Sequence, residues 1–453
     1  GTFLAGFYLI AAIGMVMTVF AVAVVLALMA VIHGRGTRVI RFSAYLFLLA
    51  PIALLVKLPD QQTLAQRLRL QPVSPNNVVY RAESQYSHIM IVHRENQNIR
   101  EMILDRLIHS RVNLDDPREI RYEYEWTYTG VLDKYYPPEQ PMTALVIGGG
   151  GYTYPHYLEV TRPGSYIEVA EIDPEVTEAA YEAFGLPRDT TIKSFSMDAR
   201  NRVDDLIRKK AAGEQVPVFD CIFGDSINDY SVPYHLTTAE FNKNIRELLK
   251  PDGIYMLNLI DMLDSGQFLA AVVNACRTVW PNVYVFSSFD NPKTRDTFIV
   301  VSSARELSLD EIPSQLTATY GGYRGRMLPR EEVDALVART GNHTLTDDFA
   351  PVDNMLRPVV QFSRDVATDS LIRTAEMFVG EGNFGAAIRR ARRAIGISPD
   401  SAKAYEMLGY VYGQKGDLDR ACENLRKAVG LDPSCARALS RLADVLQKKG
   451  DTA

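Results

Sequence analysis

Acidic residues stand at the ends of three strand-like runs in the sequence, and their spacing indicates what chemistry the chain can perform. They are Glu171 at the end of the run 165–172, Asp198 after 191–195, and Asp225 and Asp229 after 219–223. In open α/β sheets ligands bind outside the carboxyl ends of the strands, so these side chains should face one pocket. Carboxylates placed there can hold a cationic amine or, when desolvated, take a proton from it.

A run of glycines precedes these acids and directly follows an apolar strand-like segment, 143–147. The four residues are Gly148, Gly149, Gly150 and Gly151. Glycine lets the backbone turn sharply and come close to a ligand, where a following helix presents its free amide groups. Glu171 lies 23 positions beyond Gly148, close to the spacing at which dinucleotide folds present an acid to ribose hydroxyls.

With Asp198 placed to receive the base, the pattern predicts a nucleoside pocket. A tight turn without a ligand, together with solvated or helix-capping acids, is the alternative. His235 lies near the predicted pocket and is either a further acid or base or a structural histidine. The aromatic residues Tyr122, Tyr124 and Trp126 either line the pocket or pack the domain.

The elements that must position these residues alternate between strand-like and helical patterns, as expected of parallel crossover units. We assign 78–140 to a small β-domain and 141–365 to an α/β nucleoside-binding domain. Residues 59–370 carry a net charge of −14 without a basic stripe, which argues against nucleic acid and favours cationic ligands. The histidines and the four widely spaced cysteines show no metal-ligand pattern, so no metal is expected and the thiols should be free.

The N-terminal segment predicts a membrane anchor. Residues 3–32 contain no charged side chain, and about 20 apolar residues suffice to cross a bilayer. A second apolar run, 42–56, is a short second span or an interfacial helix. Because the chain begins with Gly1 rather than Met, we assign 1–58 to the end of a longer membrane region, followed by a linker at 59–77. Basic residues flank the second run on both sides, so charge counting leaves the topology open.

An evenly spaced repeat marks the other end of the chain. Its turns begin at Gly382, Gly416 and Gly450. This spacing is the period of tetratricopeptide repeats, which stack helix pairs into an array with a concave binding surface. We therefore predict an all-α array at 366–453 that binds a protein partner. Capping of the neighbouring domain or self-association is the alternative.

Together these motifs resemble the spermidine synthase-like polyamine aminopropyltransferases, in particular their membrane-fused bacterial branch. The resemblance covers about residues 78–360. It rests on Val79-Tyr80, Glu83-Ser84-Gln85-Tyr86 and the strand 89–92, then on VIGGGG, EIDP, Asp198-Ala199, GDSINDYSVPYHLTTAEF and the segment 345–354.

The resemblance implies a Rossmann-like class I methyltransferase fold with a small N-terminal β-domain. It implies a site for decarboxylated S-adenosylmethionine, with the glycines near the nucleoside, Glu171 on the ribose, and Asp198 with Ala199 near the adenine. Asp225, and Asp229 if an insertion restores it to the site, would act on the attacking amine of putrescine or another polyamine. Because these donors are cytoplasmic metabolites, the synthase and repeat domains would lie on the cytoplasmic side of a bacterial inner membrane.

Three residues depart from the family pattern. Gly151 stands where synthases have an Asp that binds the aminopropyl ammonium, and Ser87 stands where they have Gln. Asn228 stands in place of the second catalytic Asp, with Asp229 one position later, and an Asn side chain cannot act as a base. The residues expected to bind the nucleoside therefore match the family pattern better than the residues expected to bind the amine.

Three functions fit this pattern. The leading one is membrane-anchored aminopropyl transfer from decarboxylated S-adenosylmethionine to a polyamine. The second is a catalytically inactive synthase fold that serves as a scaffold subunit of a membrane assembly, which the glycine at position 151 would permit. The third is methyl transfer from S-adenosylmethionine, whose own carboxylate would tolerate the loss of an acid there.

Overall fold

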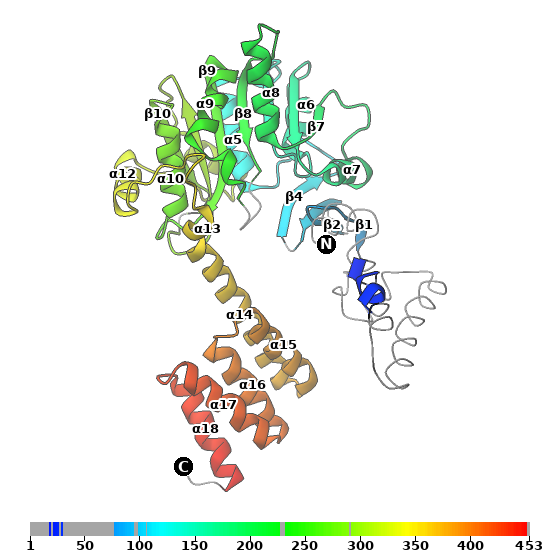
Figure 1. Cartoon of the computed structure of the whole chain (residues 1–453), viewed down its shortest axis with the longest axis vertical. Helices are drawn as coiled ribbons and strands as arrows, with labels where there is room; N and C mark the ends of the chain where they lie inside the picture. Colours follow the sequence, from blue (N-terminus) through cyan, green and yellow to red (C-terminus); the bar gives the residue numbers. More distant parts are fainter. Residues whose placement is uncertain are drawn as a thin grey trace. The chain divides into compact units, whose positions relative to one another are not determined.

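The structure of the 453-residue chain is a computed structural model, and it describes residues 18, 19, 21–26, 29, 77–94, 98–105, 107–226, 232–289 and 291–450. The chain divides into two compact units. One comprises residues 1–260, 267–290 and 296–352, and the other comprises 261–266, 291–295 and 353–453. The first unit contains two sheets with their covering helices, and the second contains the C-terminal helices (Figure 1).

A four-stranded antiparallel sheet begins the first unit, as predicted for this region. Its strands pair in chain order and are β1 (Val78–Glu83), β2 (His88–Arg94), β3 (Ile99–Leu104) and β4 (Leu107–Asn113). Ile89 and Ile91 of β2 and Met102 of β3 are fully buried, so one face of this sheet packs into the core.

The second sheet has eight strands in the order β12-β10-β11-β9-β8-β5-β6-β7. They are β5 (Thr143–Ile147), β6 (Tyr166–Glu171), β7 (Lys193–Ser196), β8 (Phe219–Gly224), β9 (Leu249–Asp261), β10 (Asn282–Ser287), β11 (Asp296–Ser303) and β12 (Arg326–Met327). Strands β5 to β9 pair in parallel, whereas β10 pairs antiparallel with β11 and β12. The apolar runs of β5 and β8 are almost entirely buried, as expected for central parallel strands covered on both faces.

The parallel strands β5 to β9 are connected by α6 (Thr153–Thr161), α7 (Pro174–Ala183), α8 (Ala199–Ala211) and the 3₁₀ turn η2 (Tyr234–Leu236) with α9 (Ala239–Leu248). Helix α5 (Glu123–Tyr135) precedes β5, and α10 (Gln267–Arg277) connects β9 to β10. After β11 come α11 (Ile312–Tyr320), α12 (Arg330–Arg339) and α13 (Val352–Met355). Helices α8, α9 and α10 pack in succession in front of the sheet (Figure 1). Helix α5 packs against α11 and β11. The predicted Rossmann-like arrangement is confirmed.

The two sheets of this unit share one hydrophobic core. It joins Ile89 and Met102 of the small sheet to Val146 and Phe223 of the large sheet. The cysteines of the chain are free thiols, as predicted: Cys221, Cys276 and Cys422 are buried and Cys435 is partly exposed. Because the core is continuous, the small sheet has a fixed position against the edge of the large sheet where the predicted site residues lie.

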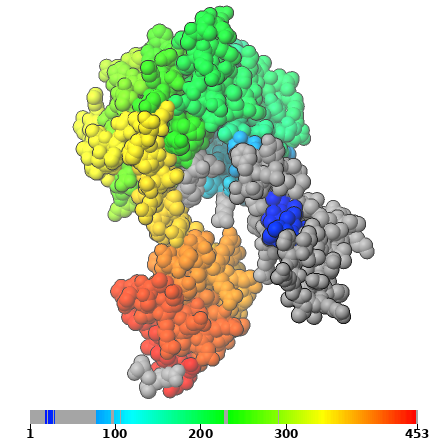
Figure 2. Space-filling view, in the orientation of Figure 1, coloured from blue at the N-terminus to red at the C-terminus, as the bar shows by residue number. Residues whose placement is uncertain are grey.

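The second unit contains stacked helix pairs, which form one continuous body in the space-filling view (Figure 2). They are α14 (Arg357–Gly380), α15 (Phe384–Ile397), α16 (Ala402–Lys415), α17 (Leu418–Leu431) and α18 (Ala436–Lys449). Gly382, Gly416 and Gly450 have φ angles of 71°, 86° and 79°, so the same left-handed turn recurs once in every repeat. The predicted array of two helix pairs and a final helix is confirmed.

The predicted membrane segments fall almost entirely outside the described residues. Within 3–32 only residues 18, 19, 21–26 and 29 are described, all of them helical, and none of 42–56 is described. In the parts of the chain that the structure describes, no helix combines the length and the apolar character needed to cross a membrane.

A buried ion pair fixes α8 to the parallel sheet and yields a stability prediction. Arg202 donates from Nη2 to Oε2 of Glu168 at 2.7 Å, and Glu168 on β6 is fully buried. Replacing Arg202 by Leu leaves that carboxylate buried without its cation, at a cost of about 3–5 kcal/mol. Calorimetry should therefore show a clear fall in the melting temperature of the first unit.

Arg208→Leu is the matched control, because Arg208 lies on the same helix with 74% of its side chain exposed. Its loss should change the stability by less than about 0.5 kcal/mol. Equal melting temperatures for the two variants would contradict a stabilising role for the buried pair.

Candidate active site

A cavity of about 180 Å³ lies at the carboxyl ends of the parallel strands. The loop after β5 contributes Gly148 and Gly150, the end of β6 contributes Glu171, and the end of β8 contributes Asp225. The turn between β1 and β2, strand β4 and the segment 233–236 line the other sides. This is the edge at which open α/β sheets bind ligands, so the two sheets together form a candidate ligand site.

The cavity brings together most of the residues singled out in the sequence. Those that line it are Gly148, Gly150, Glu171, Asp198, Ala199 and Asp225. Gly149 and Gly151 belong to the same loop but do not line the cavity. Asp229 and Asn228 lie outside the described residues. The role of each residue toward a ligand remains a prediction.

Glu171 connects the two turns that form the floor of the cavity. Its Oε2 accepts a hydrogen bond from the amide of Gly149 at 2.7 Å, and its Oε1 accepts one from the amide of Asp173 at 2.9 Å. The residue is only 8% exposed, and this burial raises the pKa of its carboxyl, whereas the two amides oppose the rise. Each oxygen retains a lone pair that can accept a hydrogen bond from a ribose hydroxyl.

Most amides of the glycine loop donate hydrogen bonds within the protein. The amide of Gly148 donates to Ala170 O at 2.9 Å, that of Gly149 to Glu171, and that of Gly151 to Ser110 Oγ at 2.9 Å. The loop thus uses its donors to hold its own shape. Gly148 has φ +92°, and a Cβ there would clash with the carbonyl oxygen of Asp225, so glycine is required for the close approach of the two loops.

Asp173 also lines the cavity, although no role for it was predicted from the sequence. Its carboxylate caps α7 by accepting from the amide of Glu175 at 3.0 Å. Its Oδ2 accepts from Ser84 Oγ at 2.5 Å and from Ser87 Oγ at 3.4 Å, which ties the β1–β2 turn to this edge of the large sheet. Ser87, one of the three departures from the family pattern, therefore helps to hold the wall of the cavity.

Asp198 stands at the N-terminus of α8 and is held from two sides. Its Oδ1 accepts from the amide of Arg200 at 2.7 Å, and its Oδ2 lies 3.0 Å from Nε2 of His235. The hydrogen bond with His235 is the largest influence that lowers the pKa of Asp198. His235 thus contacts a residue that lines the cavity, and whether it acts as an acid or base stays open.

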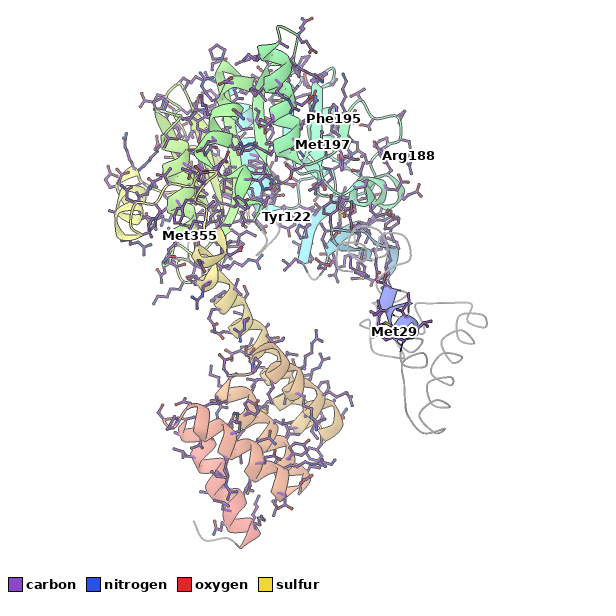
Figure 3. All side chains as sticks on the ribbon, viewed as in Figure 1. Met29, Tyr122, Arg188, Phe195, Met197 and Met355 are labelled. Carbon is purple, nitrogen blue, oxygen red and sulfur yellow. The ribbon has the colours of Figure 1, made fainter. Side chains whose placement is uncertain are left out.

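Asp225 lies between two hydrogen-bond donors that come from distant parts of the chain. Tyr124 of α5 donates its hydroxyl to Oδ2 at 2.8 Å, and Asn258 of β9 donates from Nδ2 to Oδ1 at 2.7 Å. Burial raises the pKa of Asp225, and both donors oppose that rise because they stabilise the charged form. Tyr122, labelled in Figure 3, instead donates to the carbonyl of Ile108 at 2.6 Å, so only one of these two tyrosines contacts the site acid.

The partners of Asp225 carry no local sequence signal, because they become its neighbours only through the fold. Trp126, the third aromatic residue in question, packs the domain, since its ring stacks on Tyr320 with centroids 4.7 Å apart. In the described part of the chain no group of three or more His, Cys, Asp or Glu side chains is placed to hold a metal ion.

Comparison with solved structures identifies this architecture. A probable spermidine synthase from Corynebacterium glutamicum superposes with a TM-score of 0.52 and 21% identity, covering 62% of this chain and 99% of that structure. The first unit has the spermidine synthase fold. In the second unit, residues 402–435 match the tetratricopeptide repeat family.

Sequence relatives of the synthase-like unit fall into two groups. The polyamine aminopropyltransferase of Vibrio vulnificus is 26% identical over 189 residues, which is 41% of this chain and 60% of that enzyme. The human eEF1A lysine and N-terminal methyltransferase is 28% identical over 153 residues, 32% of this chain and 21% of that protein. A probable polyamine aminopropyl transferase of Bifidobacterium longum is 30% identical over 125 residues, 28% of this chain and 25% of that protein. The chain thus matches between about one fifth and three fifths of these relatives.

The packing of the synthase-like unit explains why no acid follows the three glycines. A Cβ on Gly151 would clash with the ring of Phe184 and lie 2.9 Å from Cβ of Ser110. An Asp cannot occupy this position without displacing the Phe184 ring. The glycine at position 151 therefore matches the packing of its neighbours Phe184 and Ser110, so the departure from the family pattern involves more than one residue.

This packing predicts a specific coupling between two residues. Gly151→Ala should destabilise the unit by about 1–3 kcal/mol, the usual cost of overpacking a core. In the Gly151→Ala/Phe184→Ala double variant the clash with the ring is gone and only the close approach to Cβ of Ser110 remains, so the cost of the added methyl group should fall. Urea unfolding of the wild type and the three variants gives the coupling energy. Strictly additive effects would contradict the proposed contact.

Proposed function

We propose that the synthase-like unit binds an adenosyl sulfonium in its cavity and transfers a carbon group from it to a nitrogen atom of a cationic acceptor. The observation that carries this proposal is the convergence of Glu171, Asp198 and Asp225 on one cavity beside Gly148. The aminopropyltransferase relatives support aminopropyl transfer to a polyamine as the first form of the reaction.

Glu171 would bind the ribose hydroxyls, and Asp198 with Ala199 would lie beside the adenine. Asp225 would act on the acceptor, as would Asp229, which lies outside the described residues. The charges of the cavity favour a cation: Glu171, Asp173, Asp198 and Asp225 line it, and no described lining residue is Lys or Arg. A sulfonium and a polyamine both suit such a surface.

The reaction requires little covalent chemistry from the protein. The lone pair of a neutral amine forms a bond to the carbon next to sulfur, the carbon–sulfur bond breaks, and its electron pair stays on sulfur as a thioether. The proton released from the amine passes to Asp225. Burial raises the pKa of Asp225, which makes its carboxylate a stronger base, so the residue suits this step. Alignment of the amine with the carbon supplies most of the remaining acceleration.

Methyl transfer is the second candidate. It is favoured by the absence of an acid at Gly151 and by the methyltransferase relatives. A scaffold without bound donor is the third candidate.

We further propose that residues 3–32 anchor the protein in a membrane with its domains on the cytoplasmic side, where such donors occur. We also propose that the repeat unit binds a protein partner.

Donor binding tests the proposal directly. Titration calorimetry of the full chain with methylthioadenosine, S-adenosylmethionine and decarboxylated S-adenosylmethionine should show binding of at least one of them. Glu171→Gln should weaken that binding by about tenfold or more, because it removes a charged acceptor from the ribose and disturbs the Gly149 turn. Glu178→Gln, at a half-exposed position of α7 outside the cavity, is the control and should bind normally.

If no adenosyl compound binds, the transferase proposal fails and the scaffold remains. If a donor binds, mass spectrometry of putrescine or spermidine incubated with it identifies the transferred group. An unchanged affinity in Glu171→Gln would remove the ribose assignment.

The role of Asp225 as a base predicts a shift in the pH profile. A base must be deprotonated, so kcat/KM should fall as the pH drops through its pKa. The Tyr124 hydroxyl stabilises the charged form and lowers that pKa, so Tyr124→Phe should move the acidic limb of the profile to higher pH.

Tyr122→Phe provides the control, because its hydroxyl contacts the carbonyl of Ile108 rather than Asp225. Buried Glu125 also titrates near this site, because burial and the charge of Asp225 raise its pKa to about 8. Both variants retain Glu125, so its titration contributes to both profiles. Identical profiles for the two variants would show that another group accepts the proton.

A further inference from the structure

Strand β4 contains a β-bulge that directs a histidine into the cavity. In the pairing of β3 with β4, Met102 lies opposite Ser110 and the next residue, Ile103, lies opposite Ile108. His109 is therefore the extra residue of the bulge. Bulges change the direction of a side chain and are common beside active sites. His109 lines the cavity together with Gly150 and Leu104.

The next residue, Ser110, contacts the glycine loop. Its Oγ accepts the amide hydrogen of Gly151 at 2.9 Å and lies 3.1 Å from the position that a Cβ would take on Gly150. Because the oxygen acts as the acceptor in this bond, its own hydrogen remains to be donated. The bulge thus places the imidazole of His109 at the end of the cavity where Gly150 lies, while Ser110 beside it holds the glycine loop.

This end of the cavity is where the tail of an adenosyl sulfonium would extend. The adenine and ribose residues, Asp198 and Glu171, follow β7 and β6, so the loop at Gly150 and the bulge at His109 remain for the tail. An acid at position 151, which would suit the ammonium of a decarboxylated tail, is absent, and the Phe184 ring excludes one.

The four carboxylates of the cavity are each hydrogen-bonded to donors within the protein. A ligand carboxylate in the cavity would therefore need other hydrogen-bond donors of the protein. Glu171 accepts from two amides, and Asp225 accepts from Tyr124 and Asn258. Asp173 and Asp198 are held in the same way by the turns and side chains described above. His109 supplies a donor at the tail end, where a carboxylate would lie farthest from the adenine-binding acid.

We propose that His109 binds the α-carboxylate of the donor's methionine tail, so that the donor is S-adenosylmethionine rather than its decarboxylated form. This inference rests on the proposed function of the cavity. The group transferred would then be the methyl group, leaving S-adenosylhomocysteine, or the 3-amino-3-carboxypropyl group, leaving methylthioadenosine. In both cases the carbon–sulfur bond breaks, its electrons stay on sulfur, and the amine proton passes to Asp225.

Calorimetric titration of the full chain with three adenosyl compounds separates this inference from the proposed function. Wild-type protein should bind S-adenosylmethionine at least about tenfold more tightly than decarboxylated S-adenosylmethionine, as expected for charge-assisted hydrogen bonds. His109→Asp should reverse that order, because the new carboxylate repels the tail carboxylate and attracts a tail ammonium. Methylthioadenosine has no tail, so its affinity should be the same in both proteins.

His88→Asp is the matched control, since it places the same charge on the small sheet outside the cavity, and it should keep the wild-type order. Equal or tighter binding of the decarboxylated donor by wild-type protein overturns the inference while leaving the proposed function intact. Loss of methylthioadenosine binding in His109→Asp also overturns it, because the histidine would then stabilise the structure of the cavity rather than recognise the tail of the donor. If wild-type protein binds none of the three compounds, the proposed function itself fails.

Discussion

The buried carboxylate of Glu171 is the constraint on which the rest of the site depends. It accepts the amides of Gly149 and Asp173, so it fixes the turn after β5 relative to the turn after β6. A ribose would have to share this carboxylate with the two amides. The same group would therefore maintain the empty cavity and recognise the ligand, which makes donor binding sensitive to any change at this position.

The small sheet completes the cavity through polar contacts with α7. Ser84 and Ser87 donate to Asp173, and the hydroxyl of Tyr80 donates to Glu175 at 2.6 Å. These contacts come from the β1–β2 hairpin, whose turn lines the cavity. The shared hydrophobic core fixes the sheet, and the serines then fix the turn. The wall that faces the ligand is thus determined at two levels, by burial and by hydrogen bonding.

Local patterns in the sequence were sufficient to predict the parallel strands and the helical repeats. The run 143–147 was predicted as a buried strand, because it is a short apolar segment that ends in glycines, and it coincides with β5. The regular glycine spacing of the C-terminal repeats likewise predicted turns that all adopt the left-handed conformation. In contrast, Asn258 is distant from Asp225 in the sequence, and Phe184 is equally distant from Gly151. Such contacts depend on strand order and helix packing, which no local pattern encodes.

The bulge at His109 shows the same limit in another form. Alternation along β4 places Ser110 toward the glycine loop and would direct His109 to the opposite side. One extra residue in the strand changes that direction, and a single sequence contains no signal for it. The acceptors for the amides of Gly149 and Gly151 likewise come from other strands, in Glu171 and Ser110, so no local pattern indicates them.

The electrostatics of the cavity argue against a purely architectural role. Burial raises the pKa values of Glu171, Asp173 and Asp225, which means that their charged forms are held at a cost in folding free energy. A cavity of about 180 Å³ in the same place also forgoes packing that apolar side chains could supply. A scaffold gains nothing from either cost, because apolar residues of similar size would hold the strands together at least as well. Binding a cation offsets both, since its charge stabilises the carboxylates and its atoms fill the space. These costs support the proposal of a cationic ligand over that of a scaffold.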